Sequence, residues 1–90
     1  MNELRFTRTA TRNLQEDLPE AVAAAAVELI YGDLRSNPLR VGGPLKGKFD
    51  GLYSAHRGTY RVIYSVTGLP NSDDYLITIV TVRHRGKVYH

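Results

Sequence analysis

The stretch that decides the fold reads TYRVIYSVT and spans residues 59–67. Tyr60, Val62 and Tyr64 fall on one face of an extended chain, because successive residues of a β-strand point to opposite sides. Arg61 falls on the other face, in the middle of the run. An arginine in mid-strand needs either a carboxylate partner or an anionic ligand on its own face. The run therefore predicts a strand that is apolar on one face and presents a cation on the other.

Two further strand-like runs flank this one. Residues 52–56 precede it across a tight turn at Arg57-Gly58, and residues 75–82 follow it after a loop that contains Pro70 and Asn71. Glycine, proline and asparagine have the backbone preferences that such turns require. The third run is apolar on both faces, which is typical of a strand in the middle of a sheet. The three runs together predict an antiparallel meander.

The first part of the chain predicts one short strand and two helices. Residues 4–6 alternate apolar and charged side chains, and residues 9–14 then follow a helical period. A second helix, rich in alanine, begins after Asp17, whose carboxylate forms a capping box with Glu20, and ends before Pro38. We therefore expect an α+β fold, in which a small antiparallel sheet (the N-terminal strand plus the three-stranded C-terminal meander) packs against two N-terminal helices.

The composition excludes several classes of protein. With 90 residues, 42% hydrophobic and 23% charged, the chain is typical of a single globular domain over residues 1–90. It contains no cysteine, which excludes a disulfide scaffold, a thiolate zinc site and a cysteine nucleophile. The longest mostly apolar run, residues 21–30, includes Glu28 and is far below the ~20 residues of a membrane span. No signal peptide is visible at the N-terminus, so we expect a cytoplasmic protein without a membrane partner.

The net charge is distributed unevenly along the chain. Residues 1–34 hold three arginines against six acidic residues, a net charge of −3, whereas residues 35–90 hold nine basic residues against three, a net charge of +6. A basic surface attracts polyanions such as RNA and DNA, or an acidic protein. The second part of the chain is therefore expected to be a basic binding module.

Two motifs for small ligands are incomplete. Residues 42–48 follow the start of a phosphate-binding P-loop, but Phe49 stands where a serine or threonine must hold magnesium. His56, His84 and His90 are scattered, and no His-Glu-x-x-His pattern occurs. We therefore expect neither nucleotide hydrolysis nor a bound metal ion or other cofactor.

Three segments of the second part of the chain keep a specific spacing. They read Gly51-Leu52-Tyr53-Ser54, then Arg57-Gly58-Thr59-Tyr60-Arg61-Val62-Ile63-Tyr64, and last Val82-Arg83-His84-Arg85 with Val88-Tyr89. In these motifs, and in the order of its predicted elements, the chain resembles the RelE/ParE superfamily of toxin–antitoxin toxins over nearly its whole length. RelE-like members of this superfamily cut messenger RNA in the ribosomal A site and are neutralised by a dedicated antitoxin. ParE-like members share the fold but inhibit DNA gyrase.

The resemblance implies roles for individual residues. Arg61 matches the strand arginine that faces the scissile phosphate, and Tyr89 matches the C-terminal tyrosine that stacks on or orients the RNA. Arg85 best matches the second active-site arginine, with Arg83 as the alternative. Cleavage by attack of a ribose 2′-hydroxyl on its own phosphate requires no metal ion, only a base, an acid and cations for the developing charge. We assign the cationic role to Arg61 and Arg85, because the guanidinium fork binds phosphate through two donors.

The residue that moves the proton is left open. RelE has two lysines on the strand before its arginine, and Leu52 and Ser54 occupy those positions here. Histidine exchanges protons near neutral pH, so His84 and His56 are the candidates. In a regular strand His84 and Arg85 point to opposite sides and cannot both face the RNA. In a meander the remaining basic groups converge on one concave face as RNA-binding residues: Lys46, Lys48, His56, Arg57, Arg83 and Lys87.

The sequence is thus interpreted as a RelE-like toxin of a type II toxin–antitoxin system, a metal-independent endoribonuclease that cuts messenger RNA on the ribosome. Its expected partners are a cognate antitoxin, with which it forms a hetero-oligomer, and messenger RNA in the A site, next to 16S ribosomal RNA. The alternative is a ParE-like toxin that inhibits DNA gyrase without cutting nucleic acid. A toxin fold that serves only as a binding partner is the third interpretation.

Overall fold

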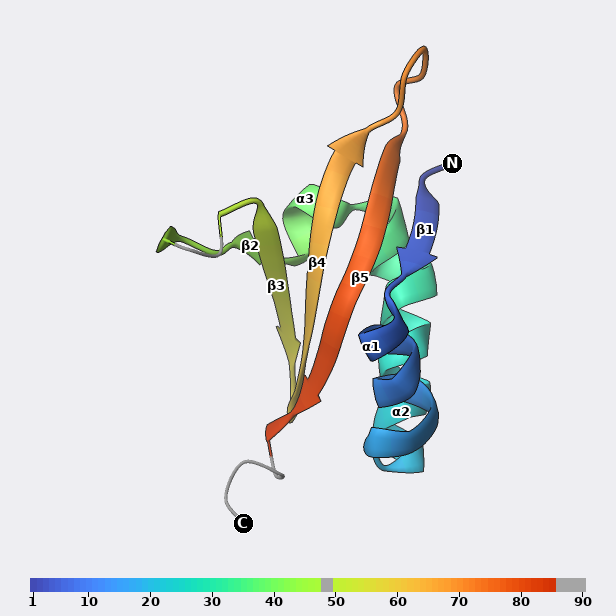
Figure 1. Ribbon diagram of the computed structural model, residues 1–90, viewed down its shortest axis with the longest axis vertical. Helices are drawn as coiled ribbons and strands as arrows, with labels where there is room; N and C mark the ends of the chain where they lie inside the picture. Colours follow the sequence, from blue (N-terminus) through green and yellow to red (C-terminus); the bar gives the residue numbers. More distant parts are fainter. Residues whose placement is uncertain (48–49, 86–90) are drawn as a thin grey trace.

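The computed structural model describes residues 1–47 and 50–85, whose helices and strands are shown in Figure 1. The N-terminal part consists of strand β1 (Glu3–Phe6), helix α1 (Arg8–Arg12), the π-helical turn η1 (Asn13–Asp17), helix α2 (Glu20–Leu29), a second π-helical turn η2 (Ile30–Leu34) and helix α3 (Pro38–Val41). The C-terminal part consists of strands β2 (Gly43–Pro44), β3 (Leu52–Arg57), β4 (Tyr60–Gly68) and β5 (Tyr75–His84).

The strands form one sheet in the order β1-β5-β4-β3-β2. Strands β3, β4 and β5 are the antiparallel meander that the sequence predicts, and the α+β class is confirmed. Strand β1, however, runs parallel to β5, with Leu4 opposite Ile77 and Phe6 opposite Ile79, so the sheet is mixed rather than wholly antiparallel. Alternation of side chains predicts a strand but not its direction. That direction follows from the path of the chain, which continues from β1 into α1 along the same edge of β5 (Figure 1).

The hydrophobic core lies between the helices and one face of the sheet. Its fully buried members come from the helical segments and from the three long strands: Ala10, Ala26, Ile30, Leu34, Ala55, Val62, Tyr64, Ile77, Ile79 and Val82. The opposite face of the meander, called the open face below, carries Leu52, Ser54, His56, Arg61, Ile63, Ser65, Thr81 and Arg83. None of the described helices has the length and apolarity that crossing a membrane requires.

Tyr64 anchors the helices to the sheet from the middle of β4. Its side chain is completely buried, and its hydroxyl donates a hydrogen bond of 2.6 Å to the carbonyl of Pro38. Its ring stacks on that of Tyr53, with centroids 5.6 Å apart. Gly42 leaves the space for this hydroxyl, because a Cβ at that position would lie 2.5 Å from it and 2.7 Å from the carbonyl oxygen of Ser54.

The helix starts differ from the sequence expectation. Thr7 caps α1, its hydroxyl accepting a hydrogen bond of 3.0 Å from the Ala10 amide. The capping box predicted for Asp17 and Glu20 is wrong: Pro19 is the N-cap residue of α2 and makes no side-chain cap bond. Asp17 ends η1 instead, where its carboxylate accepts a hydrogen bond of 2.9 Å from the Asn13 amide group and is not available to cap the next helix.

Strand β5 contains a β-bulge. Tyr64 lies opposite Ile79 and Ile63 lies opposite Thr81, so Val80 has no partner residue on β4. One extra residue reverses which side chains point to which face, because the alternation has a period of two. Ile79 and Val82, three residues apart, are therefore both buried in the core.

Candidate active site

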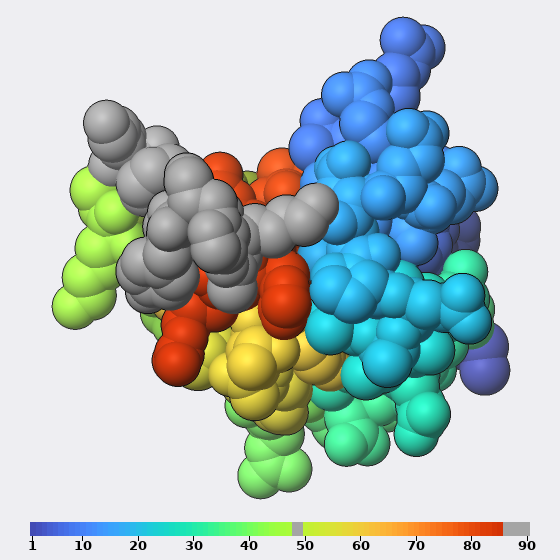
Figure 2. Space-filling model, turned by 90° about the horizontal axis from the view of Figure 1, so that it is seen from below, coloured from blue at the N-terminus to red at the C-terminus, as the bar shows by residue number. Residues whose placement is uncertain are grey.

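One end of the open face carries a row of basic side chains. Arg61 of β4 lies directly opposite His56 of β3 on one side and Arg83 of β5 on the other. Neighbouring strands are about 4.8 Å apart, so these three side chains lie next to one another. All three residues are exposed. Figure 2 looks at this end of the molecule, where the β3–β4 turn (yellow) and the last described residues of β5 (red) meet.

These residues surround a shallow recess, which we call the arginine recess. Its lining consists of His56, Thr59, Tyr60, Arg61, Arg83, His84 and Arg85. Its volume of about 180 Å³ is smaller than the roughly 300–1,000 Å³ of pockets that enclose a small molecule. A ligand that places one anionic group in the recess and extends beyond it fits this size better than a free nucleotide.

The cations of the recess have no acidic neighbours among the described residues. Within residues 1–47 and 50–85 the only ion pair joins the amino terminus to Asp74, at 2.9 Å. Arg61 and Arg83 thus stand side by side without a carboxylate to neutralise them. Directly opposed like charges destabilise a sheet, so this pair is a candidate binding site for an anion.

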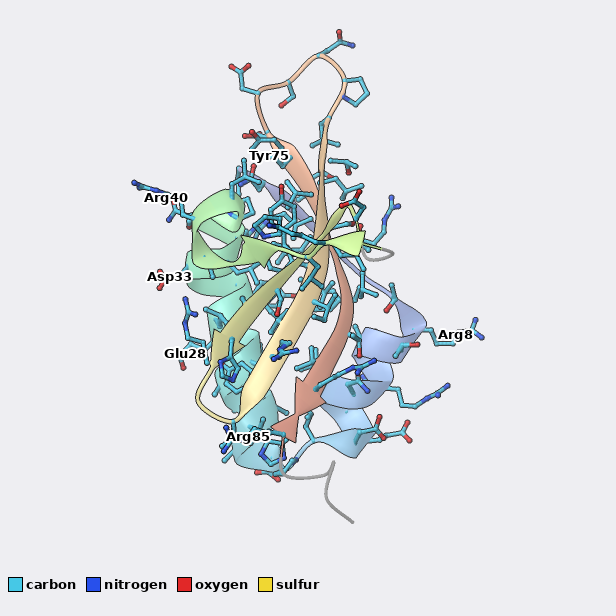
Figure 3. All side chains as sticks on the ribbon, turned by 90° about the vertical axis from the view of Figure 1, so that its left-hand side faces the viewer. Arg8, Glu28, Asp33, Arg40, Tyr75 and Arg85 are labelled. Atoms are coloured by element: carbon cyan, nitrogen blue, oxygen red, sulfur yellow. The ribbon has the colours of Figure 1, made fainter. Side chains whose placement is uncertain are left out.

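His84 and Arg85 both reach the recess, although strand alternation predicts that they diverge. Strand β5 ends at His84, and the Arg85 amide donates a hydrogen bond of 2.7 Å to the Thr59 carbonyl. Arg85 therefore lies beyond the regular strand, at the lower end of β5 in Figure 3. His84 is half-buried, with its Nε2 3.1 Å from the Thr59 hydroxyl, and its buried Nδ1 has no hydrogen-bond partner in the described part of the chain.

Arg57 does not join the other basic residues, which corrects the expectation that all of them converge on one face. It lies opposite Tyr60 on the helix side of the sheet and lines a separate groove, called the helix groove, with Ala25, Glu28, Leu29, Gly32, Asp33 and Tyr60. Figure 3 shows Glu28 and Asp33 projecting from this helical side of the molecule. The register explains the separation, because Arg57 is one residue away from His56 and so points to the opposite face.

Lys46 is exposed but does not line the recess, so it too stays apart from the arginines. Leu52, at one of the two positions where RelE has a lysine, lines an apolar groove that adjoins the recess. Lys48, Lys87 and Tyr89 lie outside the described residues. Of the residues predicted from the sequence, the structure brings five basic ones together in the recess: His56, Arg61, Arg83, His84 and Arg85.

Two recess residues, Thr59 and Tyr60, are absent from the site that the sequence predicts. The sequence places Tyr60 on the face opposite Arg61, and its hydroxyl donates a hydrogen bond of 3.3 Å to the Ala25 carbonyl of α2. Burial raises the pKa of Tyr60, the nearby Arg57 lowers it and Glu28 raises it. Both residues lie between the turn glycine Gly58 and Arg61, and this position is the feature of the sequence that indicates their place in the site.

Comparison with known proteins identifies the family. A family model described as the ParE toxin of the type II toxin–antitoxin system parDE matches residues 4–89. The chain belongs to this family.

Among the described residues of this toxin, no three histidine, aspartate or glutamate side chains lie close enough together to hold a metal ion.

Individual relatives place this toxin near the RelE type. Toxin RelG of Mycobacterium tuberculosis is 46% identical over 88 residues, covering 96% of this chain and 93% of the relative. Toxin RelE of the same organism is 42% identical over 84 residues, covering 93% and 81%. The solved toxin–antitoxin complex RelBE2 of M. tuberculosis contains a chain that superposes with a TM-score of 0.81 at 43% identity, covering 93% of this chain and 98% of that one. This protein is therefore a RelE-like toxin of a type II toxin–antitoxin system.

Proposed function

We propose that this toxin is a ribosome-dependent endoribonuclease that cuts messenger RNA in the A site and so inhibits translation. The observation that carries the proposal is the pair of Arg61 and Arg83, directly opposite each other on the open face with no carboxylate beside them among the described residues. A phosphate group between two guanidinium groups relieves their repulsion, and each planar fork offers it two donors. The similarity to toxins named RelG and RelE supports the same function.

Cleavage starts when the 2′-oxygen of a ribose attacks the adjacent phosphorus. A base takes the proton of the 2′-hydroxyl, and a phosphorane with negative oxygens forms. The bond between phosphorus and the 5′-oxygen of the next nucleotide then breaks, an acid gives that oxygen a proton, and a 2′,3′-cyclic phosphate remains. Arg61 and Arg83 stabilise the charge on the phosphorane. The reaction requires no metal ion.

Two histidines line the recess together with the arginine pair and are proposed to move the protons. His56 lies beside Arg61 on the open face. His84 lies opposite Tyr60, on the helix side of the sheet, and also lines the recess. One acts as the base and the other as the acid, a division of roles that suits two histidines near neutral pH. Arg85 lies at the rim of the recess, where it binds a neighbouring phosphate. Tyr89 is proposed to stack on the RNA.

The deciding experiment uses ribosomes with a defined codon in the A site. The toxin should cut the message there and leave a 2′,3′-cyclic phosphate. A matched message with one 2′-deoxynucleotide at the cleaved position should stay intact, because it lacks the attacking hydroxyl. Cleavage of the deoxy message would contradict the mechanism, and absence of cleavage on any codon would contradict the proposed function.

Gyrase inhibition is the second candidate, because the family model that matches this chain is named after ParE and the strand positions of the RelE lysines hold Leu52 and Ser54. The same preparation of toxin should therefore also be added to DNA gyrase and relaxed plasmid. Under the ribonuclease proposal, supercoiling continues at toxin concentrations that stop translation. Inhibited supercoiling with intact message would favour the ParE-like function.

We further propose that a cognate antitoxin binds this toxin in the cytoplasm as a hetero-oligomer, as the solved RelBE2 complex supports. Residues 35–90 carry a net charge of +6, so an acidic antitoxin segment gains attraction from the basic end of the sheet. Its affinity should fall as salt rises from about 0.1 to 1 M, since the screening length falls from roughly 10 to 3 Å. A flat salt dependence, measured by calorimetry, would assign the affinity to apolar contacts instead.

A further inference from the structure

The position of Arg83 depends on the bulge in β5. If β5 were regular after Ile79, Val80 would lie opposite Ile63, and Arg61 would lie opposite Val82 rather than Arg83. Arg83 would then point toward the helices, because each shift by one residue moves a side chain to the other face. The extra residue, Val80, is what brings the two arginines of the candidate site together on the open face. Bulges commonly re-aim side chains next to active sites.

Two side chains from outside the meander hold this bulge. The Thr7 hydroxyl donates a hydrogen bond of 2.7 Å to the carbonyl of Val80, the residue without a partner on β4. Asn13 accepts two hydrogen bonds through its Oδ1, one of 2.9 Å from the Thr81 hydroxyl and one of 3.0 Å from the Val82 amide. Thr7 and Asn13 are the residues on either side of helix α1. The short helix thus spans the bulge and bonds to it at both ends.

These hydrogen bonds satisfy backbone polar groups that the bulge leaves without a partner. A bulge interrupts the ladder of hydrogen bonds to the neighbouring strand, and β1 ends at Phe6, so it offers no backbone partner to residues 80–82. The part-buried Val80 carbonyl and Val82 amide find side-chain partners instead. Without those partners the bulged form of β5 would lose stability relative to a regular strand.

We infer that Thr7 and Asn13 are positioning residues for the reaction: they hold the bulge and thereby place Arg83 beside Arg61. This inference rests on the proposed ribonuclease function for its catalytic consequence, but the strand register that it describes can be measured independently. Neither side chain lines the recess, so any effect on cleavage acts through β5.

The register is tested by proton nuclear magnetic resonance of Asn13→Ala and Thr7→Val. The Val82 amide points away from β4 toward Asn13, so Val62 and Val82 are a non-hydrogen-bonded pair with close α-protons. We expect this α-proton contact to weaken relative to that of Val66 and Ile77, on the other side of the bulge. An unchanged ratio in both variants would overturn the inference, whether or not the toxin cuts RNA.

The catalytic consequence is tested by combining each change with Arg83→Gln. We expect each single variant to cut programmed ribosomes about 10- to 100-fold more slowly, the scale for a small misplacement of a catalytic group. In the Arg83→Gln background the same changes should have no further effect. Additive losses would show that Thr7 and Asn13 act independently of Arg83, and would refute the inference.

Two controls separate this role from simple stabilisation. Thr7→Ser keeps the hydroxyl, and with it both the α1 cap and the hydrogen bond to Val80. Unlike Thr7→Val, it should therefore cut at nearly the rate of the parent toxin. Thr67 also donates its hydroxyl to a β5 carbonyl, that of Leu76, at 3.3 Å and far from the bulge. Thr67→Val should therefore leave both the Val62–Val82 contact and cleavage unchanged. Loss of cleavage in Thr67→Val would count against a specific role for the bulge. Should Asn13→Ala fail to fold, Thr7→Val carries the test alone.

Discussion

Replacing Arg61 with glutamine removes one charge from the arginine pair and keeps most of the side chain that lies on the sheet. Arg61 is exposed and, among the described residues, has no acidic partner; its cross-strand neighbours are His56 and Arg83. Directly opposed like charges cost roughly 0.2–1 kcal/mol. Arg61→Gln should therefore change the free energy of unfolding by less than about 1 kcal/mol, in the stabilising direction. The melting temperature should stay level or rise by no more than ~8 °C.

The same change should be severe for the reaction. If Arg61 donates to the phosphorane, its loss should slow single-turnover cleavage by about 10²–10³-fold, the scale for removing one transition-state donor. Arg61→Lys should recover only part of this loss, because a point charge cannot reproduce two parallel hydrogen bonds. Thermal melting and A-site cleavage on the same preparations give the two quantities.

Arg57→Gln is the matched control. It removes the same charge from the same end of the sheet, but Arg57 lines the helix groove rather than the recess. Its melting temperature should equal that of the parent toxin, and its single-turnover cleavage rate should stay within a few-fold of the parent rate. Normal cleavage by folded Arg61→Gln would refute the catalytic role, and equal losses in both variants would show that only overall charge matters. A drop of more than ~8 °C in the melting temperature of Arg61→Gln would instead make Arg61 a structural residue.

Gly42→Ala should lower stability by about 1–3 kcal/mol through overpacking, because its Cβ would lie 2.5 Å from the Tyr64 hydroxyl; Gly43→Ala, with no atom within 4 Å of its Cβ, is the neutral control in urea unfolding. Tyr64→Phe leaves the Pro38 carbonyl unpaired and should cost about 1–3 kcal/mol. Burial raises the pKa of Tyr64, so the unfolded chain loses this proton first. Stability should therefore fall as pH rises above about 10, less steeply in Tyr64→Phe, and equal slopes would refute this. For the reaction, His56→Ala should slow single-turnover cleavage by about 10²–10⁴-fold, the usual contribution of a general acid or base; an unchanged rate would exclude His56 as base or acid.

Much of the candidate site could be predicted because it depends on alternation within single strands. The pattern around Arg61 predicts that it lies on the face opposite Tyr60 and Val62, and the strand register confirms this, although Tyr60 also borders the recess. The choice between Arg83 and Arg85 as its partner could not be made in this way. It depends on a bulge in β5, and residues 75–82 are apolar on both faces, so the pattern shows no preferred position for the extra residue.

The sequence by itself determined the turn after Arg57, the meander, the presence of an alanine-rich helix and the basic character of the second part of the chain. These follow from local properties, namely side-chain period, turn residues and charge. The sequence did not predict helix α3 or strand β2, and helix α2 ends at Leu29 rather than just before Pro38. The tertiary structure decided the parallel direction of β1 and the meeting of Arg61 with Arg83. Each of these depends on a partner distant in the chain, such as Thr7 beside Val80, 73 residues apart. Such pairings are selected by packing and by hydrogen bonds that exist only once the sheet has formed, and no local pattern encodes them.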